Sequence, residues 1–205
     1  MHALIIVDIQ NDFVPGGALA VPGGDEIIPI VNELQDSFSL VVATQDWHPA
    51  HHKSFASSHP GKKVFEKVSL HGLDQVLWPD HCIQGTAGAA LHKNFNLNKV
   101  EAIFRKGMDP DIDSYSGFYD NGYRKSTGLA GYLRERKVRK VYVVGLASDY
   151  CVFYTAKDAI KENFETYIIE DASRAINADA FNKTKDEILS TGGQIINTKN
   201  FHRHL

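Results

Sequence analysis

Short apolar runs alternate with amphipathic stretches along this chain of 205 residues. Amphipathic spacing of apolar residues, as at Ile27, Ile30, Val31 and Leu34, predicts helices. We expect helices at residues 26–34, 128–136 and 178–190, and a further one beginning close to residue 151. Apolar runs without alternation predict buried strands at residues 3–7, 40–44, 100–104, 138–146, 165–170 and 193–196.

This order of strands and helices indicates an α/β protein. Strands that are apolar on both faces are typical of a parallel sheet covered by helices on each side. We therefore predict a three-layer α/β/α sandwich with a mostly parallel, six-stranded, Rossmann-like sheet. Residues 47–88 are expected to be irregular. No repeat or linker composition interrupts the chain, so residues 1–205 are predicted to form a single domain.

Reactive or charged residues follow four of the predicted strands. Asp8, Asp46 and Lys106 end the first three, and the strand at 138–146 leads to Cys151. Parallel α/β sheets bind ligands beyond the carboxyl ends of their strands. One charged residue at a strand end is commonly structural, but four reactive or charged residues at one edge predict a site.

Cys151 lies in the stretch VYVVGLASDYCVFYTAKDA, where a strand gives way to a helix. Ser148 and Asp149 are residue types that cap helices, which places Cys151 in the first turn. Free N–H groups and the helix dipole there favour a thiolate and can hold an oxyanion.

A thiol, a carboxylate and an ammonium from three strands suit acyl transfer from an amide. Asp8 can take the proton of Cys151 and return it to a leaving amine, while Lys106 stabilises both anions. A small buried cysteine beside an Asp–Lys ion pair is the alternative interpretation.

Histidines gather in the middle of the chain, and seven of the ten lie between His48 and His92. Asp46 and His48 alternate after a strand and His81 can complete a three-ligand set, which is typical of a catalytic metal site. His51 and His52 lie close behind. Asp80 is expected to point elsewhere. These donors suit zinc, iron or manganese, and their spacing does not choose among them. We expect one divalent ion, with zinc first.

Aromatic residues in predicted loops can form the walls of a pocket for a flat ring. They are Phe13, Trp47, Trp78, Tyr115 and Phe118. Covering a core beneath long loops is the alternative role, and it is strongest for Trp47.

Composition narrows the class of protein. A net charge of −3 gives no electrostatic case for nucleic acid or an anionic membrane. Two cysteines, Cys82 and Cys151, do not make a disulfide framework, and Asp8 comes too early for a signal peptide. We expect a cytoplasmic protein with a small-molecule substrate and no membrane segment. A monomer and a homo-oligomer both remain open.

Taken in order, the motifs resemble those of the nicotinamidase (pyrazinamidase) family of isochorismatase-like cysteine hydrolases. The resemblance covers residues 4–175. Its motifs are DIQNDF from Asp8, DWHP from Asp46 with His52 and Ser54-Phe55, WPDHC from Trp78, FRKG from Phe104, YSGF from Tyr115 and GLASDYCV from Gly145.

The resemblance implies hydrolysis of the linear amide of nicotinamide to nicotinate and ammonia in NAD salvage, and of pyrazinamide as well. Asp8, Lys106 and Cys151 match the family's catalytic triad, and Phe13 and Trp78 match the residues that sandwich the pyridine ring. Asp46, His48 and His81 match its metal ligands, with His52 a ligand in some members only. The family also places a cis peptide before Ala147, whose N–H forms the oxyanion hole with that of Cys151. Tyr150 receives no role.

Two other functions remain as alternatives. One is another amide or carbamoyl hydrolase on the same scaffold. The other is a non-enzymatic metal-binding or thiol-sensing protein, which places no demand on Asp8 or Lys106.

Overall fold

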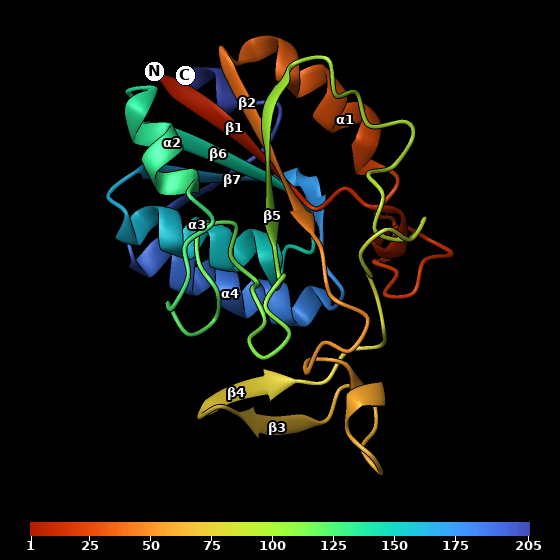
Figure 1. The fold of residues 1–205 in the computed structure, drawn as a ribbon. Coiled ribbons are helices and arrows are strands. Elements are labelled where there is room, and N and C mark those ends of the chain that lie inside the picture. Colours follow the sequence, from red (N-terminus) through yellow and green to blue (C-terminus); the bar gives the residue numbers. More distant parts are fainter.

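A six-stranded parallel sheet forms the centre of the computed structural model, which describes residues 1–205 (Figure 1). The strands follow the spatial order β5-β2-β1-β6-β7-β8, and every neighbouring pair is parallel. The predicted sheet is therefore confirmed. Its strands are β1 (His2–Val7), β2 (Leu40–Asp46), β5 (Val100–Lys106), β6 (Lys140–Leu146), β7 (Glu165–Arg174) and β8 (Gln194–Ile196).

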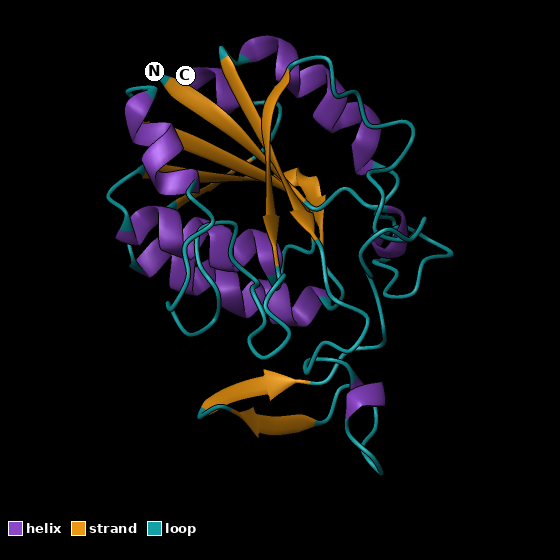
Figure 2. Cartoon of the chain, in the orientation of Figure 1, coloured by secondary structure: helices purple, strands orange, loops and turns teal.

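Helices cover both faces of this sheet and complete three layers (Figure 2). Helix α1 (Ile27–Leu34) packs on one face, with Phe201 of the 3-10 helix Phe201–Arg203 in the same cluster. Helices α2 (Leu129–Glu135), α3 (Cys151–Lys161) and α4 (Ala178–Ser190) lie on the other face. Three further 3-10 helices lie in connections, at Asn11–Phe13, Gln35–Ser37 and Ala56–Ser58.

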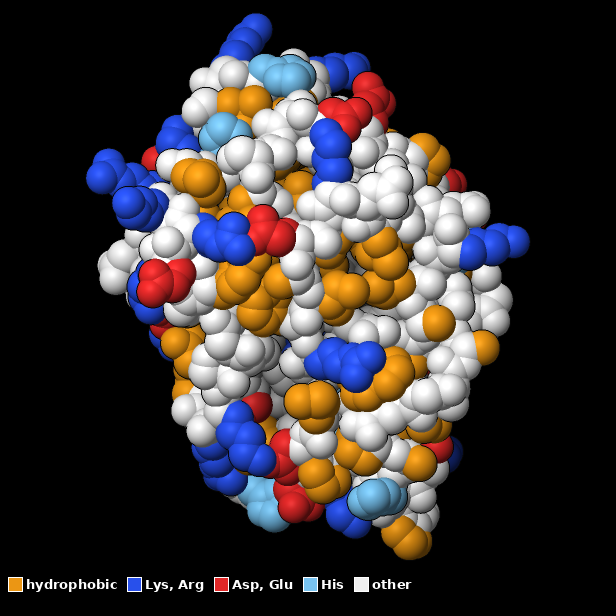
Figure 3. All heavy atoms as spheres, turned by 45° about the horizontal axis from the view of Figure 1, so that its top comes forward, with side chains coloured by type: hydrophobic (Ala, Val, Ile, Leu, Met, Phe, Trp, Pro, Cys, Tyr) orange, Lys and Arg blue, Asp and Glu red, His pale blue; other side chains and the backbone are white.

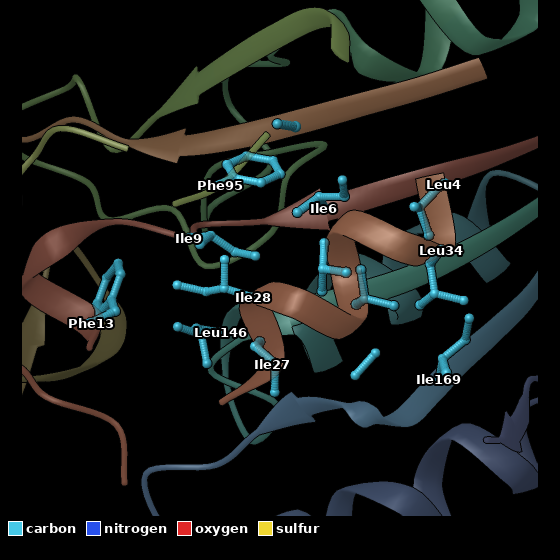
Figure 4. Packing of buried hydrophobic residues seen from close by; sticks show 14 of the residues in the cluster. Leu4, Ile6, Ile9, Phe13, Ile27, Ile28, Leu34, Phe95, Leu146 and Ile169 are labelled. Atoms are coloured by element: carbon cyan, nitrogen blue, oxygen red, sulfur yellow. The ribbon is translucent and has the colours of Figure 1, made fainter. Parts of the chain in front are cut away.

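Side chains of the central strand β1 point alternately into the two hydrophobic cores, one on each face of the sheet. Leu4 and Ile6 point to the α1 side, whereas Ala3, Ile5 and Val7 point to the α3 side, and all five are fully buried. Figure 4 shows Leu4 and Ile6 facing Ile28 and Leu34 of α1. Truncating such a residue to alanine typically costs about 2–5 kcal/mol. Burial on both faces is the reason that the strand sequences do not alternate.

A small hairpin lies beyond the carboxyl end of the sheet, below it in Figure 1. Strands β3 (Lys67–Leu70) and β4 (Leu73–Val76) pair antiparallel across His71 and Gly72, which have φ of 51° and 82°. Two left-handed residues make the tight turn that hairpins prefer. The expectation of an irregular segment at 47–88 is wrong here, because four-residue strands with half-exposed side chains give only a weak hydrophobic pattern.

Charged side chains of both signs are interspersed over the face seen in Figure 3, and no large area of one sign stands out. No helix combines the length and the apolar character that crossing a membrane requires.

Candidate active site

Four side chains from separate strand ends meet at the carboxyl edge of the sheet. Lys106 Nζ lies 2.9 Å from Asp8 Oδ2, 3.0 Å from Asp46 Oδ1 and 3.4 Å from Cys151 Sγ. It also donates to the carbonyl oxygen of Ser114 at 3.0 Å. All four predicted residues are buried. The convergence expected at this edge is therefore present, with the ammonium of Lys106 at its centre.

Asp8 follows β1 with a φ of 48°, a left-handed conformation that is rare outside glycine. Thr44 of β2 donates a 2.6 Å hydrogen bond to Asp8 Oδ1. Oδ2 has the ion pair with Lys106, but no donor stands in hydrogen-bond geometry to it. Burial raises the pKa of Asp8, and Lys106 opposes that rise. The result is a carboxylate of raised basicity, held by Thr44 at one oxygen and by the ammonium of Lys106 at the other.

Cys151 is the first residue of α3, as predicted, but its thiol is not acidic. Burial raises the pKa of this thiol well above its usual range, Lys106 opposes the rise, and the carboxylates of Asp8 and Asp46 add to it. The helix start therefore does not by itself give a resting thiolate, because burial and the two anions favour the thiol. Cys151 needs a base to become a nucleophile.

The turn between β6 and α3 leaves two backbone donors free. The Leu146–Ala147 peptide is cis, in agreement with the family resemblance. Neither the N–H of Ala147 nor that of Cys151 donates to another group of the chain. Both residues line the same cavity, and neither donor is taken up by the chain beside it.

Ser148 and Asp149 do not cap α3, and the expectation that they do so is wrong. The residue before the helix is Tyr150, and no side chain caps it. Asp149 instead accepts hydrogen bonds from the N–H groups of Ile176 and Asn177, at 3.0 and 2.9 Å. This carboxylate thus joins the cysteine turn to the segment that leads into α4.

A cluster of metal-ligating types adjoins Lys106. Asp46 Oδ2 lies 2.9 Å from His48 Nε2 and 3.4 Å from His81 Nε2, and all three residues are buried. Nδ1 of His48 faces the carbonyl of Gly107 at 2.9 Å, and Nδ1 of His81 faces that of Pro79 at 2.8 Å. Because a carbonyl only accepts, each Nδ1 carries a proton, and Nε2 of each ring is the nitrogen that faces Asp46. The donor set fits a divalent cation.

Neighbouring charges shift the pKa values of Asp46 and Lys106 in this cluster. Burial would raise the pKa of Asp46, but His48 and Lys106 together hold it well below its usual value. Burial would likewise lower the pKa of Lys106, yet the two carboxylates keep it well above its usual value. Asp46 and Lys106 therefore stay charged at neutral pH.

His52 and Asp80 lie apart from this set. The His52 ring centroid is 4.4 Å from that of His48, and its donor atom groups with those of His48 and Asp113 rather than with Asp46 and His81. Asp80 accepts a hydrogen bond from Ser57 at 2.6 Å and points elsewhere, as expected.

A partly open cavity joins the cysteine to the metal-ligating cluster. Its volume is about 20 Å³, room for little more than a water molecule. The aromatic side chains of Phe13, Trp78 and Tyr115 line it, as predicted, and Trp78 Nε1 donates to the Tyr115 hydroxyl at 3.2 Å.

Two of the predicted pocket aromatics lie elsewhere. Trp47 lies outside the cavity and carries the guanidinium of Arg105 over its ring, 4.0 Å from the centroid. Phe118 is fully buried in the core on the α3 side. Both therefore follow the alternative role of covering or filling the core.

Several supporting residues were not predicted. The side-chain amide of Gln10 forms two hydrogen bonds with the backbone of Asp46. It accepts from the N–H at 2.7 Å and donates to the carbonyl at 2.8 Å. Thr44 precedes Asp46 by two residues, so strand alternation places both side chains on one face, a signal that was available. Other unpredicted residues of the cavity wall are Leu19, Asp113, Tyr150 and Ile176.

Comparison with known proteins gives a consistent picture. The isochorismatase domain model matches residues 2–200. The nicotinamidase of Acinetobacter baylyi is 49% identical over 199 residues, which are 97% of this chain and 93% of that protein.

Solved structures agree with this result. The nicotinamidase/pyrazinamidase of Acinetobacter baumanii superposes with a TM-score of 0.95 at 47% identity, covering 98% of this chain and 97% of that one. The pyrazinamidase of Pyrococcus horikoshii in complex with zinc gives a TM-score of 0.79 at 40% identity, covering 96% and 98%.

Proposed function

The chain belongs to the isochorismatase family, and we propose that it is a nicotinamidase that hydrolyses nicotinamide to nicotinate and ammonia in NAD salvage. The observation that carries the proposal is the contact of Lys106 Nζ with Asp8, Asp46 and Cys151. It joins a nucleophile, a base and a metal-ligating carboxylate in one buried cluster. The 49% identity to a nicotinamidase over nearly the whole chain supports the substrate. We also propose that residues 1–205 act as one hydrolase domain.

Asp8, Lys106 and Cys151 have distinct roles in the proposed mechanism. Asp8 accepts the thiol proton, because its carboxylate is within hydrogen-bond reach of Cys151 and burial raises its pKa. Lys106 stabilises the thiolate as it forms and moves little, since three other groups hold its ammonium. General base catalysis of this kind contributes typically about 10²–10⁴-fold.

The acylation step forms a carbon–sulfur bond and breaks a carbon–nitrogen bond. The thiolate attacks the carboxamide carbon, and the carbonyl oxygen takes the negative charge against the N–H groups of Ala147 and Cys151. Collapse of this adduct expels the amine, which leaves as ammonia with the proton held by Asp8.

Deacylation uses the same residues in reverse. Water attacks the thioester, Asp8 receives its proton, and the carbon–sulfur bond breaks to release the carboxylic acid. The proton on Asp8 then returns to the Cys151 thiolate, which restores the resting thiol.

Phe13 and Trp78 are proposed to hold the pyridine ring from its two faces, with Tyr115 fixing the indole through its hydroxyl. Asp46, His48 and His81 are proposed to hold a divalent ion. When bound, such an ion supplies a Lewis-acid anchor that orients the heteroaromatic ring.

Zinc is the ion that we propose for this site. Two imidazole nitrogens and one carboxylate oxygen form a donor set common in catalytic zinc sites, and zinc occurs in the Pyrococcus horikoshii pyrazinamidase. Iron and manganese also accept these ligands. Elemental analysis of the purified protein identifies the ion.

A substrate panel tests the proposal against a related hydrolase on the same scaffold. Ammonia release is measured with nicotinamide, pyrazinamide, an aliphatic amide and a carbamoyl compound. We expect nicotinamide to give the highest kcat/KM. A higher value for the aliphatic or carbamoyl compound would replace the proposed substrate, and release from none would favour a non-enzymatic metal-binding protein.

A further inference from the structure

Asp113 is a buried carboxylate in the cavity wall for which the proposed mechanism has no role. It is 3% exposed and lines the cavity together with Asp46, His81 and Cys151. Its Oδ1 lies 4.0 Å from His48 Nε2, on the side of the imidazole that faces Asp46. The ligating atoms of Asp113, His48 and His52 all lie within 4.8 Å of one another.

His52 supplies a second, independent feature at the same place. Its Nδ1 receives the backbone N–H of Ser54 at 3.1 Å and lies 2.7 Å from the hydroxyl of Ser54. Because Nδ1 accepts, the proton of the neutral ring is on Nε2, the opposite tautomer to that of His48 and His81. Nε2 is buried and has no partner in the chain. His52 therefore presents a hydrogen-bond donor, not a ligand lone pair.

With its histidines neutral, as metal ligation requires, the site carries unbalanced negative charge. Carboxylates of Asp8, Asp46 and Asp113 face only one ammonium, that of Lys106. The partners of Asp113 are the amide of Gln75 at 3.0 Å and the N–H of Ser114 at 2.8 Å, which orient the carboxylate but carry no charge. One divalent cation would balance the set, and buried anions require such compensation.

From these observations we propose that Asp113 and His52 form the outer shell of the metal centre. Asp113 supplies negative charge that increases affinity for a divalent ion, and His52 donates a hydrogen bond toward the ion's surroundings without coordinating it. This inference rests on the proposed function, which assigns the ion to Asp46, His48 and His81.

Metal affinity, measured apart from activity, tests the role of Asp113. Zinc binding to the metal-free protein is measured by chelator competition for the parent, Asp113→Asn, His81→Ala and Asp120→Asn. We expect a loss of about 10–100-fold for Asp113→Asn, the usual effect of outer-shell partners. Asp120 is a buried carboxylate held by the N–H groups of Gly122, Arg124 and Lys125, so Asp120→Asn is the matched control with unchanged affinity.

The outcomes separate this inference from the proposed function. If the parent binds no zinc, or His81→Ala binds as tightly as the parent, the assignment of the metal ligands itself is wrong. If His81→Ala loses affinity and Asp113→Asn does not, only the outer-shell role of Asp113 is wrong. A raised KM for nicotinamide with unchanged zinc affinity would overturn the outer-shell role, and would show that Asp113 shapes the substrate pocket together with Gln75.

Cobalt substitution tests the role of His52. The visible absorption bands of Co²⁺ report the number and type of its ligands. We expect His52→Gln to keep the band positions of the parent, since glutamine removes the imidazole but keeps an amide donor. Bands that shift to those of a lower or different coordination would show that His52 is a ligand, and would overturn this part of the proposal.

Discussion

Lys106 is the residue that unites the two halves of this site. Its ammonium contacts Asp8 and Cys151 on the side of the nucleophile and Asp46 on the side of the metal cluster. Removing one member of such a buried charge set leaves its partners uncompensated, which typically costs about 3–5 kcal/mol. Structure and chemistry therefore depend on the same few atoms.

Asp8→Asn is predicted to separate the basicity of Asp8 from its effect on the thiol. Loss of the base is expected to lower kcat by about 10²–10⁴-fold. The carboxylate of Asp8 raises the pKa of the Cys151 thiol, so its removal is expected to lower that pKa. The pH dependence of iodoacetamide alkylation measures the thiol.

Both kcat and the pKa of the Cys151 thiol must fall in Asp8→Asn for this account to hold. A variant that loses activity while its thiol reacts at lower pH fits the proposed roles. An unchanged or higher thiol pKa in Asp8→Asn would show that Asp8 does not govern Cys151.

At the residue scale, the sequence predicted which side chains meet but not their protonation. Strand ends and family motifs located Asp8, Lys106 and Cys151. The raised pKa of Cys151 depends on desolvation by neighbours from distant segments, which no local pattern reports. The same holds for Asp113, which comes from a loop without strand or helix periodicity.

Among the elements, β1 and β6 approach each other unusually closely beside the cysteine turn. Gly145 of β6 has a φ of 120° and pairs with Val7, and a Cβ at Gly145 would lie 2.1 Å from the Val7 carbonyl oxygen. Only glycine adopts this positive φ without strain and also leaves room for the Val7 carbonyl. This close contact lies directly before the turn that joins β6 to Cys151, the first residue of α3.

Gly145→Ala is predicted to lower the free energy of unfolding by about 2–4 kcal/mol, because it combines backbone strain with a clash against main-chain atoms. Gly131→Ala is the matched control. Gly131 lies in α2 with nothing within 4 Å of an added Cβ, so alanine is expected to stabilise by up to about 1 kcal/mol. Urea denaturation compares the two variants. Equal midpoints for both would contradict the close approach of the strands.

Elements with strong periodicity were predictable, and the hairpin was not. Helix α4 has the predicted bounds of 178–190, and strand β7 extends beyond its prediction to Arg174. Strands β3 and β4 have four residues each, and most of their side chains are exposed or half-buried. Their hydrophobic pattern is therefore short and weak. Yet this hairpin leads directly into Trp78, a wall of the cavity.

In the whole molecule, the catalytic and metal-ligating residues lie together at the carboxyl end of the sheet. Both termini lie together at the opposite end of the sheet, in Figure 1 next to the start of β1. The carbonyl of His204 accepts from Lys140, where β6 begins. The amino ends of the strands thus form the stable base, and the loops at their carboxyl ends carry the site, as in other open α/β sheets.

Metal removal is predicted to destabilise the whole protein. An ion that binds only the folded state at about 100-fold above its Kd adds about 2.7 kcal/mol. For a chain of this size, that corresponds to a fall in Tm of about 5–10 °C after chelation. Differential scanning calorimetry with and without zinc measures the shift, and His81→Ala is the control in which zinc has little effect. A Tm that is independent of zinc in the parent would argue against the site.

The central claim is that Cys151 is the nucleophile of an amidase. The most direct measurement is the initial rate of ammonia release from nicotinamide by the parent and by Cys151→Ala, at equal zinc content and with folding checked by circular dichroism. The account predicts steady turnover by the parent and a loss of at least about 10⁴-fold in the variant. Ammonia release by Cys151→Ala at a rate comparable to that of the parent would contradict it.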